Sequence, residues 1–191
     1  MNSYVVAAAV FVLSALVAGP VIAQQAPHVH TPREAAAELS RARFRFSPEL
    51  EKIKGLAGRW EGTTFREANG TSAAVVTYEV TAAGSAVIEK LFPGTKGEMT
   101  TVYHDDSSGR LVATHYCNAA NQPKLRLMES NGERLYFVLS PDSDIKADLE
   151  GHAHELTLLV GADGSLTHDW LNHYLGAPAA KRNITLTRIK Q

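Results

Sequence analysis

The residues of this chain that could take part in chemistry are histidines, carboxylates and one cysteine, set within alternating apolar runs. His115 and Cys117 are two positions apart, so in a strand they project from the same face. A cysteine nucleophile would also need a correctly aimed imidazole and an oxyanion site. The sequence indicates neither. We therefore expect Cys117 to be a buried, unreactive thiol, and His115 to be either a polar group in a binding pocket or a hydrogen-bonded core histidine.

Glu89 lies within the run Val87-Ile88-Glu89-Lys90-Leu91. An unpaired carboxylate is costly to bury. Glu89 therefore either faces solvent or meets an interior partner such as His115, Tyr78 or Arg126. A Glu89–His115 pair in a water-accessible cavity would favour an isomerase or hydrolase acting on an enclosed ligand.

His152 and His154 place two imidazoles on one side of a strand, a spacing compatible with zinc or copper. A metal site needs a third and usually a fourth ligand. His104, His168 or His173 could supply one only if the fold brings it close, so the sequence assigns no metal. No Cys-x-x-Cys-His motif is present, and non-covalent haem on a buried histidine is a minor alternative to having no cofactor.

Turn signals recur along the chain from residue 56, among them Asn69-Gly70, Asn131-Gly132 and Asp163-Gly164. Apolar residues alternate between these turns, as in Leu135/Phe137/Leu139 and Leu156/Leu158/Val160. The spacing predicts about ten short strands and no helix long enough for a parallel crossover. The fold class is therefore mainly β, an antiparallel barrel or sandwich preceded by one or two short helices.

The N-terminal residues have the composition of a secretory signal. Residues 4–18 are apolar or small, and Val21-Ile22-Ala23 offers a cleavage site before Gln24. We divide the chain into a signal peptide (1–23), a disordered leader with short helices (24–54) and a β domain (55–191). Start signals for the helices are Thr31-Pro32-Arg33-Glu34 and Ser47-Pro48-Glu49. The expected location is periplasmic or secreted, with no integral membrane span after cleavage; an uncleaved anchor is the alternative.

Two parts of the sequence carry a family resemblance. Gly58-Arg59-Trp60 on the first strand, with Arg188 on the last, resembles the Gly-x-Trp arrangement of lipocalin-like (calycin-type) barrels. The stretch from Leu91-Phe92-Pro93-Gly94 to Asn121-Gln122-Pro123 resembles an uncharacterised family of secreted bacterial lipocalin-like domains. The resemblance covers roughly residues 56–190 and implies a calycin-type barrel. It also implies structural roles for Gly58, Trp60 and Arg188, with a basic side chain across the indole ring.

The resulting hypothesis is an exported barrel that binds a small, mostly apolar molecule and is more plausibly a binding protein than an enzyme. A net charge of -1 and a pI near 6.7 give no reason to expect nucleic acid as a partner. We expect a monomer or weak dimer. An envelope interaction module with an apolar patch around Phe44 and Phe46 is a further alternative. The candidate ligand-binding residues are Tyr78, Glu89, Tyr103, His115, Cys117, His154 and Trp170; no catalytic residue is assigned.

Overall fold

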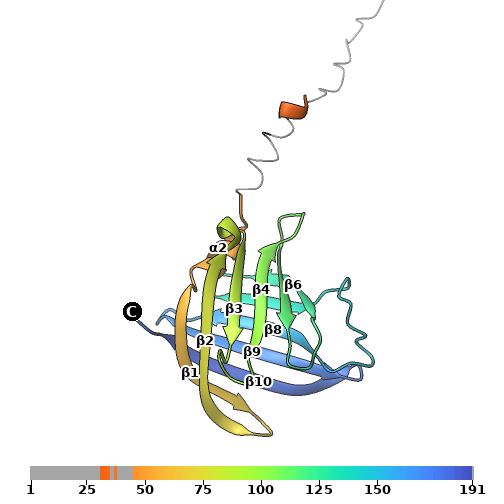
Figure 1. Ribbon diagram of the computed structural model, residues 1–191. Helices are drawn as coiled ribbons and strands as arrows, with labels where there is room; N and C mark the ends of the chain where they lie inside the picture. The colour runs from red at the N-terminus through yellow and green to blue at the C-terminus, as the bar shows by residue number, and fades with distance from the viewer. Residues whose placement is uncertain (1–30, 35–36, 38–44, 191) are drawn as a thin grey trace, which may run out of the picture. The chain divides into compact units, whose positions relative to one another are not determined.

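The computed structural model describes residues 31–34, 37 and 45–190 (Figure 1). The chain divides into two units, Met1–Glu38 and Leu39–Gln191. In the first unit, the Thr31 amide donates to Glu34 Oε2 (2.8 Å) and the Glu34 amide donates to Thr31 Oγ1 (3.3 Å), which is the predicted capping box. The proposed signal peptide and its cleavage site at Ala23 lie outside the described residues.

The second unit is a closed barrel of ten strands, so the predicted fold class is confirmed. Every strand pairs antiparallel with its neighbours along the chain, and β1 also pairs with β10, from Trp60 opposite Arg188 to Arg66 opposite Arg182. The elements are α2 (Pro48–Lys54), β1 (Gly58–Arg66), β2 (Gly70–Thr81), η1 (Ala82–Gly84), β3 (Ala86–Leu91), β4 (Met99–Asp105), β5 (Leu111–Tyr116), β6 (Lys124–Ser130), β7 (Arg134–Leu139), β8 (His152–Val160), β9 (Ser165–Tyr174) and β10 (Ala177–Arg188).

Helix α2 lies at one end of the barrel, which we call the closed end (Figure 1). Ser47 caps the helix by accepting from the Leu50 amide, and its own amide and hydroxyl donate to Asp105 at the end of β4. Leu50 and Ile53 are fully buried and belong to the apolar core of the barrel. The helix therefore covers this end with its apolar side while its cap attaches it to the sheet.

Trp60 and Arg188 join the first and last strands at the closed end. The indole is buried and donates from Nε1 to the Leu56 carbonyl (2.8 Å), and the Arg188 guanidinium lies 4.4 Å from the ring centroid. Arg188 also donates to the carbonyls of Gly55 and Ala57. Gly58 has φ of 125°, which disfavours a residue with a side chain, and an added Cβ would lie 3.4 Å from Arg188 Nη1. These contacts connect the end of α2 to both strands.

The opposite end, which we call the open end, is formed by the β1–β2, β3–β4, β5–β6, β7–β8 and β9–β10 connections. The longest of these joins β7 to β8, and its residues 141–151 contain neither helix nor strand. The described residues include no helix with the length and apolar character needed to cross a membrane.

Replacing Arg188 by Met should weaken the closed end. The variant keeps apolar contact with Trp60 but loses the cation–π contact and two charge-assisted hydrogen bonds, so we expect a loss of about 1–3 kcal/mol in the free energy of unfolding. Urea unfolding followed by tryptophan fluorescence measures this. Lys190→Met, two residues further on, is the control and should change stability little; equal losses in both variants would contradict the role given to Arg188.

Candidate functional site

A row of polar side chains crosses the barrel interior on four neighbouring strands. Tyr78, Glu89, Thr101 and His115 are successive cross-strand partners on β2, β3, β4 and β5. All four are at most 3% exposed. The row therefore places ionisable groups in a region shielded from water, where each needs a hydrogen-bond partner.

The part of this row nearest Glu89 forms a fully enclosed network. The Tyr103 hydroxyl donates to Glu89 Oε2 (2.5 Å), and the Tyr78 hydroxyl lies 2.9 Å from His168 Nε2 on β9. His168 Nδ1 faces Glu89 Oε1 at 3.9 Å. These contacts fit a neutral imidazole that accepts from Tyr78 at Nε2 and carries its hydrogen on Nδ1, toward the carboxyl group.

Burial determines the protonation of this network. It raises the pKa of Glu89 to about 7, against the lowering effect of the hydrogen bond from Tyr103 and of the nearby Tyr78 hydroxyl. It also lowers the pKa of His168 to about 3. Glu89 and His168 are 0% exposed, so a substrate has no access to them in this conformation.

His115 lies at the boundary between the enclosed network and the open end. Its Nδ1 is 3.0 Å from Thr101 Oγ1, and its ring is 4.7 Å from the Trp170 ring, centroid to centroid. Burial and then the charge of Arg182 lower the pKa of His115 to about 4. No hydrogen bond joins His115 to Glu89, so the acid–base pair that the enzyme hypothesis requires is not assembled.

A small cavity of about 40 Å³, which we call the mouth cavity, lies beside His115 at the open end. Its walls come from seven elements or loops around the barrel, and its lining residues are Arg66, Met99, His115, Cys117, Asn118, Ala153, Trp170, Asn172 and Arg182. A larger hollow of about 250 Å³ shares Arg66, Asn118 and Arg182 with it and extends to the β1–β2 hairpin and Phe92. The cavity is thus the inner end of an open depression.

The mouth cavity has an excess of positive charge and of hydrogen-bond donors. Arg66 and Arg182 are direct cross-strand partners, and neither is in an ion pair with a carboxylate of the described residues. Burial, and then the charge of Arg66, lower the pKa of Arg182 to about 10. Arg182 Nε and Trp170 Nε1 are buried and have no acceptor within the described part of the chain. Like charges placed opposite each other and unpaired donors both cost stability.

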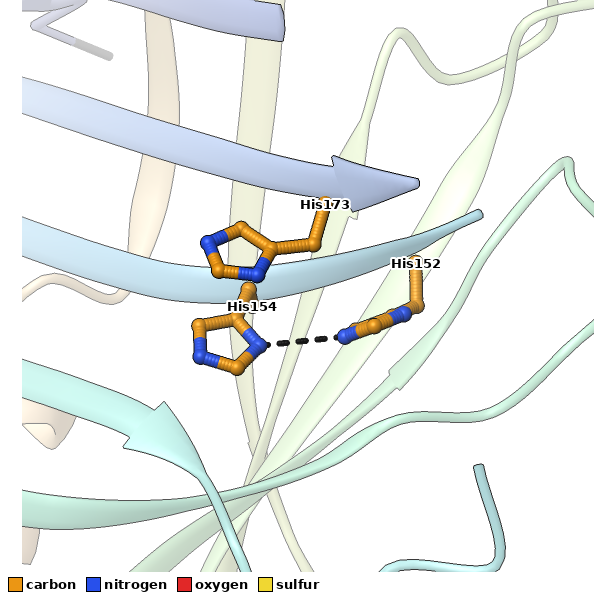
Figure 2. Close-up of side chains that lie close together, drawn as sticks. All are labelled: His152, His154 and His173. Carbon is orange, nitrogen blue, oxygen red and sulfur yellow. Dashed lines mark hydrogen bonds between the residues drawn. The ribbon is translucent and has the colours of Figure 1, made fainter. Parts of the chain in front are cut away.

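His154 lies away from this cavity, in a cluster with His152 and His173 (Figure 2). His152 Nε2 is 3.0 Å from His154 Nδ1, and the rings of His154 and His173 stack with centroids 3.6 Å apart. The fold therefore brings His173 to the His152-x-His154 pair, one of the possibilities that the sequence left open.

The seven candidate ligand-binding residues thus fall into three groups. His115, Cys117 and Trp170 line the mouth cavity, Tyr78, Glu89 and Tyr103 belong to the enclosed network, and His154 belongs to the histidine cluster. Cys117 is half-buried at the cavity rather than enclosed in the core, because the strand ends at Tyr116.

Sequence reasoning missed Arg66 and Arg182. The signal for Arg182 was its alternation with Ile184 and Leu186, which are fully buried on the same face of β10. Arg66 likewise shares one face of β1 with the buried Trp60 and Thr64, because all three are at alternating positions.

No family model matches the chain, and no curated protein matches it. The closed ten-stranded barrel is consistent with a calycin-like fold, but no known family supports the resemblance to secreted lipocalin-like domains.

The pKa of Glu89 predicts a pH-dependent effect of Glu89→Gln. In the folded protein the pKa of Glu89 is about 7, whereas its ordinary value is 4.5. Glu89 therefore makes its full contribution to the unfolding free energy below about pH 4.5, and the contribution is lost as the pH rises to about 7. Gln mimics the neutral carboxyl group and still accepts from Tyr103. Between pH 4.5 and pH 8 the variant should gain about 3 kcal/mol in unfolding free energy relative to the native chain.

Urea unfolding at both pH values measures this gain. Glu79→Gln, exposed on the neighbouring strand β2, is the control and should show a much smaller pH dependence. A difference between native and Glu89→Gln proteins that stays constant with pH would contradict the neutral carboxyl group.

Proposed function

We propose that this protein binds a small molecule with an apolar body and one negatively charged group at the open end of its barrel. The observation that carries the proposal is the pair Arg66 and Arg182, direct cross-strand partners that both line the mouth cavity and form no ion pair with a carboxylate of the described residues. A ligand carboxylate accepts well from guanidinium and offsets the repulsion between the two.

The dimensions of the depression limit the ligand. The mouth cavity of about 40 Å³ is large enough for a charged head group, and the adjoining hollow of about 250 Å³ is large enough for a short apolar body. Together they lie near the lower limit of small-molecule sites. Phe92 and Met99 supply apolar surface, and the unpaired Trp170 N–H is a further donor for the head group.

The sequence predicts a mostly apolar ligand. The positive charge of the two arginines at the mouth cavity adds a negatively charged group to it. The enclosed network and the buried apolar side chains fill the rest of the barrel interior, so a deep apolar ligand would require them to move. An amphipathic anion instead uses the depression in its present form.

Neither rival hypothesis has the same support. An enzyme would need a titratable pair that a substrate can reach, and Glu89 and His168 are enclosed. For the interaction module, Phe46 is partly buried against the core and stacks under Lys54, whose Nζ lies 3.7 Å from the ring centroid. Phe44 lies outside the described residues.

Two fluorescent probes that differ in charge test the proposal. Anilinonaphthalene sulfonate and N-phenylnaphthylamine share an aromatic body, but only the first carries an anionic group. We expect the sulfonate to bind at least about tenfold more tightly, because a charge-assisted hydrogen bond contributes about 1.5–3 kcal/mol.

Arg182→Met should remove this preference. Arg110→Met, an exposed arginine in the β4–β5 loop at the closed end, is the control and should retain it. Equal affinities of the two probes for the native protein, or an unchanged preference in Arg182→Met, would refute an anion site at the mouth cavity.

We also propose that the protein acts in the periplasm or outside the cell, on the basis of the apolar residues 4–18 and the Val21-Ile22-Ala23 site. Expression in a bacterial host followed by fractionation tests this. The periplasmic or culture fraction should contain a chain beginning at Gln24, identified by intact mass. A full-length chain confined to the cytoplasm would contradict export, and a full-length chain in the membrane fraction would indicate an uncleaved anchor.

A further inference from the structure

The geometry points to a second site, independent of the proposed ligand: His152, His154 and His173 form a binding site for a divalent transition-metal ion, for which we choose zinc. Candidate ligand nitrogens of the three side chains all lie within 4.8 Å of one another (Figure 2). Zinc bound by three imidazoles requires nitrogens about 2.0–2.1 Å from the ion. The rings of His154 and His173, which now stack in parallel, would have to rotate so that their lone pairs converge on the ion.

Cross-strand pairing brings the third histidine to the other two. His152 pairs with His173 across β8 and β9, and the register shifts between Ala153 and Glu155, so His154 is the extra residue of a β-bulge. Ala153 and the apolar residue Leu156 are both buried in the core although three positions separate them. The bulge thus shifts the alternation of β8, while His154 lies beside the His152–His173 pair.

His152 is already oriented as a metal ligand. It is 2% exposed, and its Nδ1 lies 2.8 Å from the Glu150 carbonyl, which can only accept. Nδ1 therefore carries the hydrogen, and in the neutral ring Nε2 is the acceptor in the hydrogen bond with His154 Nδ1. A bound metal ion would take over that lone pair. A backbone carbonyl that fixes the tautomer in this way is the usual outer partner of a metal-binding histidine.

The surroundings of the cluster also favour a cation. Glu155 follows His154 directly, and its negative charge acts on both His154 and His173. His154 and His173 are both half-buried and thus more exposed than His152, so an ion has access from outside. Three neutral imidazoles leave a fourth coordination position, which water would occupy.

Zinc titration of the full, untagged chain by calorimetry tests the site. His28 and His30 near the N-terminus could bind zinc weakly, so both are replaced by Gln in every protein compared. We expect one zinc ion per chain at pH 7.5. Further substitution His154→Gln or His173→Gln should weaken binding by at least about tenfold, because even the outer partners of metal-binding histidines contribute roughly 10–100-fold.

His104→Gln is the matched control. His104 is also half-buried, lies on β4 near the closed end, and its replacement should leave zinc affinity unchanged. Cobalt(II) provides a second readout, since a four-coordinate ion gives intense visible absorption that both cluster variants should lose. Absence of zinc binding, or affinity unaffected by His154→Gln and His173→Gln, would overturn the proposal. Binding of copper but not zinc would support the three histidines as metal ligands and overturn the choice of zinc as the ion.

Discussion

Strand β1 pairs with β2 on one side and with β10 on the other, so the sheet has no free edge and its inner face is separated from water. Every inward-facing polar side chain must then find a partner inside the barrel or at its open end. In the enclosed network Glu89 accepts from Tyr103 and His168 is hydrogen-bonded to Tyr78, which leaves Glu89 Oε1 and His168 Nδ1 facing each other at 3.9 Å. Arg66 is exposed, and Arg182 Nε has no acceptor among the described residues, although the guanidinium lies over the Phe92 ring. Unlike Glu89 and His168, the two arginines line the mouth cavity, where a ligand can reach them.

The same closure explains why the two ends of the barrel differ. At the closed end, α2 supplies apolar side chains and the Trp60–Arg188 contact covers the strand ends. At the open end, a depression remains beside His115 and Trp170. The histidine cluster lies near this end as well, but on β8 and β9 only, so loss of ligand binding at the mouth cavity need not affect it.

The barrel and its helical cap could be predicted from the sequence because both depend on local patterns, namely glycine turns, apolar alternation and the Ser47 cap. How deep each polar side chain lies inside the barrel could not be predicted, because it depends on the register of strands that are distant in sequence. Alternation puts Tyr78 and His115 on an inner face but does not show that only His115 reaches a cavity. The bulge that displaces His154, and the approach of His173, likewise arise from pairing between β8 and β9.

The most direct test of a ligand at the mouth cavity is native mass spectrometry of the protein purified from the compartment where it accumulates, compared with its denatured mass. We expect an added mass that is lost on denaturation, belongs to an acidic small molecule, and is absent from Arg182→Met. A native mass equal to that of the bare chain, or an adduct that persists in Arg182→Met, would contradict it.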